Sequence, residues 1–234
     1  MTSPIFERYH VLVVPGWQNS GPEHWQSRWQ DAHPAWQRVQ QADWLTPSRA
    51  DWVATLDDAV RAADRPVLLV AHSLGCATTA HWAAQHPDSA ARVVAAWLVA
   101  PADTERADAP PAVAGFAPLP RAPLPFASQI IASDNDPYCA AARADALARQ
   151  WGSALTVLPA AGHINTDAGF GPWPEGLAAL ADLAGHPAAG ATLSAAKPAH
   201  PLGTRGQSAL CCRPWNWKDC CTARALAAAK PAGR

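Results

Sequence analysis

The sequence predicts an α/β fold in which about six mostly parallel strands form one sheet with helices on both faces. Short apolar runs alternate along the chain with segments of helical spacing, and parallel strands need such helical crossovers. Four of the runs are almost continuously apolar, as is typical of strands buried on both faces. The six strands are expected at residues 11–15, 36–40, 67–71, 93–100, 127–132 and 155–158.

The segments between these runs predict helices. The first begins with Pro22 and Glu23, which suit the first turn of a helix. The second carries Trp52, Leu56 and Val60 at a spacing that places them on one helical face. The helices are expected at residues 22–31, 48–63, 74–86, 140–151 and 174–183.

One connection differs from the others in composition. Residues 101–125 hold seven prolines in 25 residues and have no clear periodicity. Because proline fixes φ and lacks an amide proton, this segment is expected to form neither a regular helix nor a regular strand. It is either a functional lid or a stiff crossover on the surface.

Charge and cysteine content divide the chain of 234 residues into two parts. Residues 1–184 contain eleven arginines, no lysine and eighteen acids, whereas residues 185–234 contain seven basic residues and one acid. We therefore expect a domain at 1–184 and a basic C-terminal extension at 185–234. The extension is expected to be disordered, and it could also be a sequence read in a shifted frame. Its paired cysteines lack the usual zinc spacing, so we expect no metal; they are Cys211, Cys212, Cys220 and Cys221.

Composition also argues against several classes of protein. No run of 18 apolar residues is present, so we expect no membrane span. The net charge of −1 does not favour binding to nucleic acid. The N-terminal segment lacks the long apolar core of a secretion signal. Together with only two cysteines in the domain, Cys76 and Cys139, this predicts a cytoplasmic protein with reduced thiols.

The sharpest motif is the run Val70-Ala-His-Ser-Leu-Gly75, at the end of the most apolar strand and the start of a helix. A nucleophilic serine on such a turn adopts positive φ and needs small neighbours two residues before and after it. Ala71 and Gly75 meet this demand around Ser73. A serine that only caps the helix is the alternative interpretation.

Candidates for an acid and a base follow two later strands. Asp134 and Asp136 lie after the run at 127–132, and chemistry alone does not choose between them. His163 follows Gly162 after the last strand, and its ordinary pKa suits a base that exchanges a proton with serine. Parallel strands place such residues at one edge of the sheet. The order serine, acid, histidine is the one expected of α/β-hydrolases.

The first strand is followed by Pro15-Gly16-Trp17, where an oxyanion hole is expected to draw one of its amides. We assign this role to the backbone N–H groups of Trp17 and Leu74. Gly16 is expected to allow the close backbone approach. Gly16, Phe170 and Trp173 are candidates for a substrate pocket.

Four segments resemble the small serine hydrolase family that includes retinoblastoma-binding protein nine and its bacterial relatives. They are VLVVPGWQNSGPEHWQSRW, VAHSLGC, SDNDPYC and AGHINTDAGFGPWPEG, within residues 9–184. The resemblance implies a compact α/β-hydrolase that lacks the first two strands of the wider fold. It also implies a triad of Ser73, Asp136 and His163, with the acid immediately before the proline. The sequence departs from the family pattern at Asn135, where two adjacent acids are usual.

These observations lead to a first hypothesis and one alternative. The first is a serine hydrolase that cleaves small carboxylic esters through an acyl-enzyme on Ser73, with amides or thioesters as further substrates. It requires no cofactor, and its partner is a small ester-like molecule. The alternative, suggested by the naming of the family after a protein partner, is a protein-binding module on a hydrolase fold.

Overall fold

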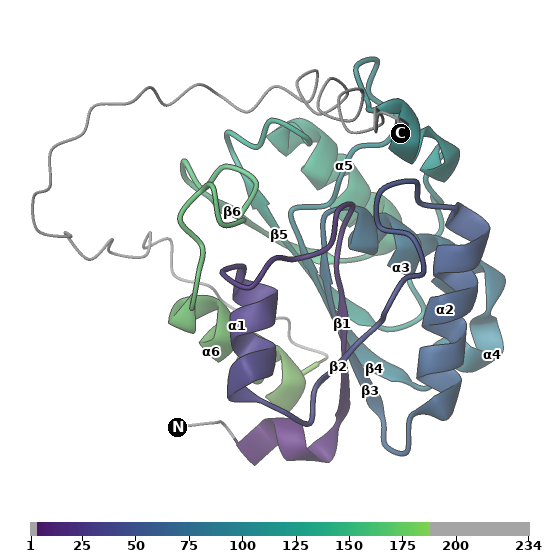
Figure 1. Cartoon of the computed structure of the whole chain (residues 1–234), viewed down its shortest axis with the longest axis vertical. Helices are drawn as coiled ribbons and strands as arrows, with labels where there is room; N and C mark the ends of the chain where they lie inside the picture. Colours follow the sequence, from purple (N-terminus) through teal and green to yellow (C-terminus); the bar gives the residue numbers. More distant parts are fainter. Residues whose placement is uncertain (1–3, 188–234) are drawn as a thin grey trace, which may run out of the picture. The chain divides into compact units, whose positions relative to one another are not determined.

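The computed structural model describes residues 4–187, and these residues form one parallel sheet with helices on both faces (Figure 1). The strand order is β2-β1-β3-β4-β5-β6, and every pairing is parallel. This confirms the predicted fold class. The strands are β1 (His10–Val14), β2 (Gln37–Arg38), β3 (Val67–His72), β4 (Val93–Val99), β5 (Ala127–Ser133) and β6 (Ala154–Leu158).

The helices lie between the strands much as the sequence predicts. Beyond the expected five, the described residues contain one further short α-helix and two 3₁₀ helices. The α-helices are α1 (Trp25–Ala32), α2 (Arg49–Ala62), α3 (Leu74–Gln85), α4 (Pro87–Ala90), α5 (Ala141–Trp151) and α6 (Pro174–Gly185). The 3₁₀ helices are η1 (Pro4–Arg8) and η2 (Pro111–Phe116), and η2 is the regular part of the proline-rich segment at 101–125. None of the helices described here is long and apolar enough to cross a membrane.

Successive side chains of each strand point to opposite faces of the sheet, and this divides the core into two layers, one on each face. In β1, Leu12 and Val14 pack with α2, α3 and α5, whereas Val11 and Val13 pack with α1 and α6. Figure 1 shows α1 and α6 on one face of the sheet and α2 and α3 on the other. Because successive side chains of a strand point to opposite faces, a strand covered on both sides must be apolar throughout.

Two boundaries differ from the prediction for local reasons. Helix α1 begins at Trp25 and not at Pro22, because the His24 side chain caps it by accepting a hydrogen bond from the amide of Gln26 (3.2 Å). Strand β2 has only two residues and lies at the edge of the sheet, which explains its weak apolar pattern. The extension expected at 185–234 lies, from residue 188 onward, outside the described residues.

Several tryptophans fill the core layer between the sheet and helices α1 and α6. Trp173 stacks on Trp29, with ring centroids 5.7 Å apart, and meets Trp25 edge-on at 5.4 Å. The Trp173 ring lies directly over Gly176, since a Cβ added to that glycine would be only 2.3 Å from the ring. Trp173 is 2% exposed, so its ring is enclosed by the core. A glycine at position 176 is therefore required by packing.

We expect Gly176→Ala to lower the free energy of unfolding by about 1–3 kcal/mol, because the added methyl group overpacks a closed core. The matched control is Gly185→Ala at the other end of α6, where an added Cβ meets nothing within 4 Å. We expect the control to stay within about 0.5 kcal/mol of the wild type. Urea denaturation followed by tryptophan fluorescence measures both, and equal stabilities of the two variants would contradict the packing argument.

Candidate active site

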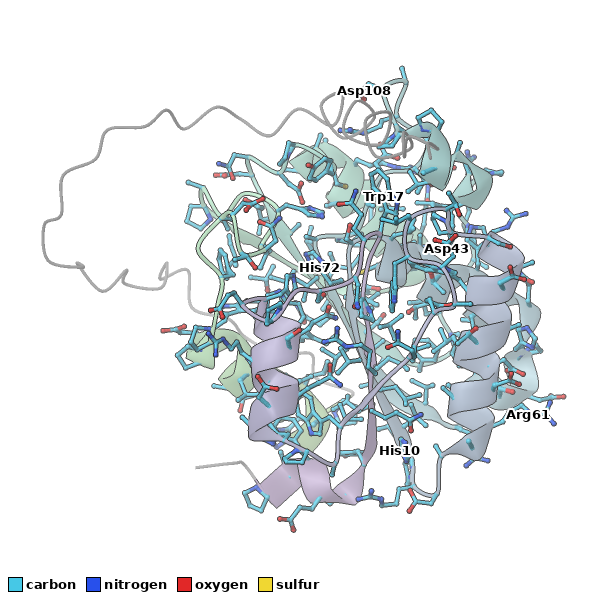
Figure 2. All side chains as sticks on the ribbon, viewed as in Figure 1. His10, Trp17, Asp43, Arg61, His72 and Asp108 are labelled. Atoms are coloured by element: carbon cyan, nitrogen blue, oxygen red, sulfur yellow. The ribbon has the colours of Figure 1, made fainter. Side chains whose placement is uncertain are left out.

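The candidate residues gather at the carboxyl end of the sheet. Gly16 and Trp17 follow β1, Ser73 follows β3, Asp136 follows β5 and His163 follows β6. The chain order of the sheet reverses between β1 and β3, and α/β sheets place their sites at such switch points. Figure 2 shows Trp17 at this end of the molecule, with Asp43 and Asp108, and His10 at the opposite end.

Ser73 occupies a tight turn between β3 and α3, with φ 55° and ψ −121°. The turn is possible because the first turn of α3 packs against the end of β1. A Cβ added to Gly75 would lie 2.2 Å from the carbonyl oxygen of Val14. Positive φ in a non-glycine residue is strained and requires such support from its surroundings. The expected conformation of Ser73 and the need for glycine at position 75 are both found.

His163 lies between Ser73 and Asp136. Its Nε2 is 2.9 Å from the Oγ of Ser73, and its Nδ1 is 2.9 and 3.0 Å from the two carboxylate oxygens of Asp136. When the proton is on Nδ1, His163 donates to Asp136 and its Nε2 accepts from the serine hydroxyl. The side chains of His163 and Asp136 are 8% and 2% exposed, whereas Ser73 is only half-buried. The arrangement can transfer a proton from an accessible serine to a shielded imidazole.

The three side chains of the turn at 134–136 each bind a different partner. Asp136 reaches His163, while Asp134 accepts a hydrogen bond from the amide of Ala160 (2.7 Å). The side-chain oxygen of Asn135 accepts from the amide of Gly162 (2.7 Å). Asn135 thus binds the loop that carries His163, and an amide oxygen suffices for this. Of the two acids that the sequence leaves open, the structure brings Asp136 to the histidine.

The amides of Trp17 and Leu74 lie near the serine with no hydrogen-bond acceptor among residues 4–187. In the same turn, the amide of Gln18 donates to Trp44 and that of Asn19 donates to Gly16. Gly16 lies against the serine, since a Cβ there would be 2.7 Å from the Cβ of Ser73 and 3.2 Å from the amide nitrogen of Leu74. Two N–H groups that are unpaired among the described residues, one at the start of α3 and one in the loop after β1, can bind an oxyanion.

The structure corrects the expectation for two pocket candidates. Phe170 and Trp173 are 1% and 2% exposed and pack in the layer under α1 and α6. Both aromatic rings face the core because this layer needs large side chains to fill it. Trp17 is half-buried at the surface, and its indole Nε1 donates to the carbonyl of Leu45 (2.9 Å).

The exposed surface beside His163 was not identified from the sequence. Tyr138 is 42% exposed, and its ring meets that of His163 edge-on with centroids 4.6 Å apart. The guanidinium of Arg106 lies over the Tyr138 ring, 5.3 Å from its centroid. The position of Tyr138 directly after the proline of the Asp136 turn was the available signal. The two side chains form a surface next to the imidazole that a substrate can contact.

Burial disfavours the charged forms of two histidines and two cysteines near the triad. Burial lowers the pKa of His72 well below its usual value, and it lowers the pKa of His24 to about 3. Burial raises the pKa of Cys76 and raises that of Cys139 to about 12, and both thiols are free. Neither thiol is a nucleophile at neutral pH. Within residues 4–187, no three His, Cys, Asp or Glu side chains gather to hold a metal ion.

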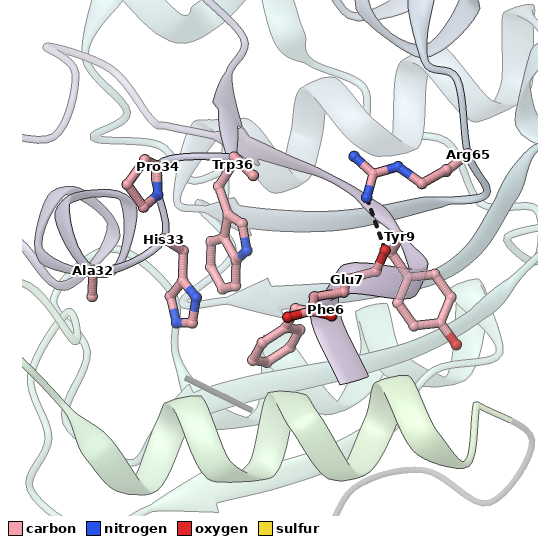
Figure 3. Close-up of a pocket in the computed structure, with 9 residues that line it drawn as sticks. Phe6, Glu7, Tyr9, Ala32, His33, Pro34, Trp36 and Arg65 are labelled. Carbon is pink, nitrogen blue, oxygen red and sulfur yellow. Dashed lines mark hydrogen bonds between the residues drawn. The ribbon is translucent and has the colours of Figure 1, made fainter. Parts of the chain in front are cut away.

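A cavity of about 340 Å³ lies at the other end of the sheet (Figure 3). It is lined by residues that precede β1 and β3, among them Phe6, Tyr9 and Arg65, and by His33 and Trp36 after α1. This end is opposite to the one that carries Ser73, so the cavity is no part of the candidate triad.

Comparison with known proteins places this geometry in a family. The model of the serine hydrolase family matches residues 11–182. A YdeN-like hydrolase from Pectobacterium atrosepticum is 33% identical, with a TM-score of 0.69 over 77% of this chain and 93% of that one. No curated protein matches the chain.

Two more distant structures share the fold. The ydeN gene product of B. subtilis is 22% identical, with a TM-score of 0.57 over 71% of this chain and 93% of that one. A hydrolase of the α/β superfamily from Xanthomonas campestris is 19% identical, with a TM-score of 0.51 over 79% of this chain and 99% of that one. Since the family model covers most of the sequence and the 33% identical structure matches this chain over most of both lengths, the chain belongs to the serine hydrolase family.

Proposed function

We propose that this serine hydrolase cleaves small carboxylic esters through an acyl-enzyme on Ser73. The observation that carries the proposal is the continuous set of contacts from Ser73 through His163 to Asp136, each about 3 Å long. Each contact is within the reach that proton transfer requires. Thioesters and amides react by the same acyl transfer and are further candidate substrates.

In the first step, the Oγ of Ser73 attacks the acyl carbon while its proton passes to the Nε2 of His163. Asp136 accepts the Nδ1–H bond and stabilises the imidazolium that forms. The tetrahedral intermediate then collapses, and His163 returns the proton to the departing alkoxide. In the second step, water attacks the acyl-enzyme with His163 again as the base, and the carboxylic acid leaves Ser73 free.

The amides of Trp17 and Leu74 are the proposed oxyanion donors. Both stay unpaired among the described residues and lie beside the serine, where negative charge develops on the carbonyl oxygen. Each such donor contributes about 3–4 kcal/mol to the stability of the transition state in comparable sites. The start of α3 adds its positive dipole end at the same point.

Two further expectations belong to this proposal. The Tyr138 ring lies edge-on against the ring of His163, with Arg106 over it, and this exposed surface is a proposed contact for the leaving group. An exposed aromatic ring there favours contact with a small alcohol or phenol.

The free thiols of Cys76 and Cys139 favour a reducing compartment, as expected of a cytoplasmic enzyme.

The nucleophile is tested by labelling with a fluorophosphonate probe. We expect the wild type to be labelled on Ser73 and Ser73→Ala to lose both labelling and ester hydrolysis. Labelling that persists in Ser73→Ala would show that another residue is the nucleophile, and a folded wild type that resists the probe would favour the protein-binding alternative.

The acid is tested by a pair of neighbouring carboxylates. We expect Asp136→Asn to lower kcat by about 10³- to 10⁴-fold, because it loses the charge that stabilises the imidazolium. Asp134→Asn is the matched control, since asparagine can still accept the bond from Ala160. Steady-state hydrolysis of a p-nitrophenyl ester measures both variants, and a larger loss in Asp134→Asn would reverse the assignment.

The oxyanion hole is tested at Gly16. We expect Gly16→Ala to lower kcat about 100-fold or more, because its methyl group has to push Ser73 away from the amides. Gly21→Ala is the control, because an added Cβ at this position in the same loop meets nothing within 4 Å. Equal kcat values for the two variants, at equal stability, would argue against this oxyanion hole.

Substrate size is tested with a series of esters of increasing acyl length. Among the described residues, the proline-rich segment at 101–125 lies in the longest connection without an α-helix and is the proposed cap, so we expect an open, modest pocket that favours short acyl chains. Values of kcat/KM are therefore expected to fall with length. A rate that keeps rising beyond about ten carbons would contradict this expectation.

A further inference from the structure

The loop that carries His163 is strained at several positions. Ala160, Gly162 and Ile164 have φ values of 51°, 56° and 48°. Positive φ is easy for glycine, but for a β-branched residue such as Ile164 it is a genuine outlier. Strained backbone of this kind persists only where surrounding groups hold it in place. The groups that hold Ile164 therefore also determine where the adjoining imidazole lies.

Two buried ring N–H groups bind the backbone at this point. The Nε2 of His72 is 3.0 Å from the carbonyl oxygen of His163, and the Nε1 of Trp25 donates to the carbonyl of Ile164 (2.9 Å). His72 is the last residue of β3, and Trp25 is the first residue of α1. The loop is thus fixed to two elements that are distant from it in sequence.

Both donors are themselves held by packing. His72 is 5% exposed and Trp25 is completely buried. The His72 ring lies between those of His24 and His163, with centroids 4.7 and 4.9 Å away, and meets Trp25 edge-on at 5.9 Å. Side chains enclosed in this way have few alternative rotamers, so the carbonyls they bind are confined as well.

The protonation state of His72 fits the role of donor. Burial keeps its pKa well below the usual value, so the ring is neutral and carries a single proton. A carbonyl oxygen only accepts, so the bond to His163 requires this proton on Nε2. The neutral ring also brings no positive charge next to the imidazole that must itself become charged during catalysis.

We propose that His72 and Trp25 are positioning residues that clamp the His163–Ile164 backbone and so keep the imidazole between Ser73 and Asp136. This inference rests on the proposed function, in which His163 is the base. In the alternative, both residues only fill the core, and their N–H groups merely avoid being unpaired. The two cases differ in kcat, because loss of core packing lowers stability without misplacing the imidazole.

The test uses variants that separate the N–H group from the ring. His72→Phe and Trp25→Phe keep an aromatic ring and lose the donor, whereas His72→Gln places an amide N–H near the original Nε2. Trp29→Phe is the matched control. Trp29 is also a buried tryptophan of α1, but its Nε1 donates to the carbonyl of Pro172 (2.7 Å) and not to the backbone of His163 or Ile164. Each variant is measured for ester hydrolysis, urea stability and the downfield proton resonance of the His163–Asp136 bond.

We expect His72→Phe and Trp25→Phe to lower kcat by about 10- to 100-fold with little change in KM, because small displacements of a catalytic group have effects of this size. The downfield resonance is expected to broaden or shift. His72→Gln is expected to recover most of the lost kcat, and Trp29→Phe is expected to keep the wild-type kcat and resonance.

Wild-type kcat in folded His72→Phe and Trp25→Phe would overturn the inference, as would a loss in Trp29→Phe equal to that in Trp25→Phe. If His72→Phe does not fold, the comparison of His72→Gln with Trp25→Phe still decides. Failure of the proposed function gives a different result, since either the wild type would then show no ester hydrolysis or Ser73→Ala would keep it, whatever the clamp variants do.

Discussion

The contact between the end of β1 and the first turn of α3 is the constraint on which the candidate site depends. Gly75 has no side chain, so the helix approaches the carbonyls of Val14 and Pro15 closely enough that even a methyl group would overlap them. The same approach places Gly16 against Ser73 and holds the serine at positive φ. The hydroxyl, two amides that find no acceptor within residues 4–187 and the positive end of a helix therefore lie close together.

The sheet and the candidate triad were predictable because both leave local signals. A strand buried on both faces must be apolar, and parallel strands place the residues that follow them at one edge. The start of α1 was missed because His24, a rare capping residue, replaces the usual signal. Phe170 and Trp173 were wrongly placed because nearness to a motif does not indicate which side of a loop an aromatic ring faces. Contacts between distant segments, such as that of Trp25 with Ile164, leave no local pattern.

Rigid surroundings support the strained parts of the site. Ser73 is held by the packing of Gly75, and the carbonyls of His163 and Ile164 are bound by ring N–H groups from β3 and α1. The turn at 134–136 binds the same loop through Asp134 and Asn135. Strain of this kind is common where function requires one particular arrangement of side chains. The tryptophan layer that contains Trp25 is closely packed, and because such interiors deform little, it restricts movement of the clamp.

The most direct test of the account is a crystal structure of the enzyme after reaction with a fluorophosphonate. We expect phosphorus bonded to the Oγ of Ser73, with the phosphoryl oxygen about 2.7–3.1 Å from the amide nitrogens of Trp17 and Leu74. The imidazole of His163 should stay in contact with Asp136. An adduct on another residue, or a phosphoryl oxygen directed away from both amides, would contradict the account.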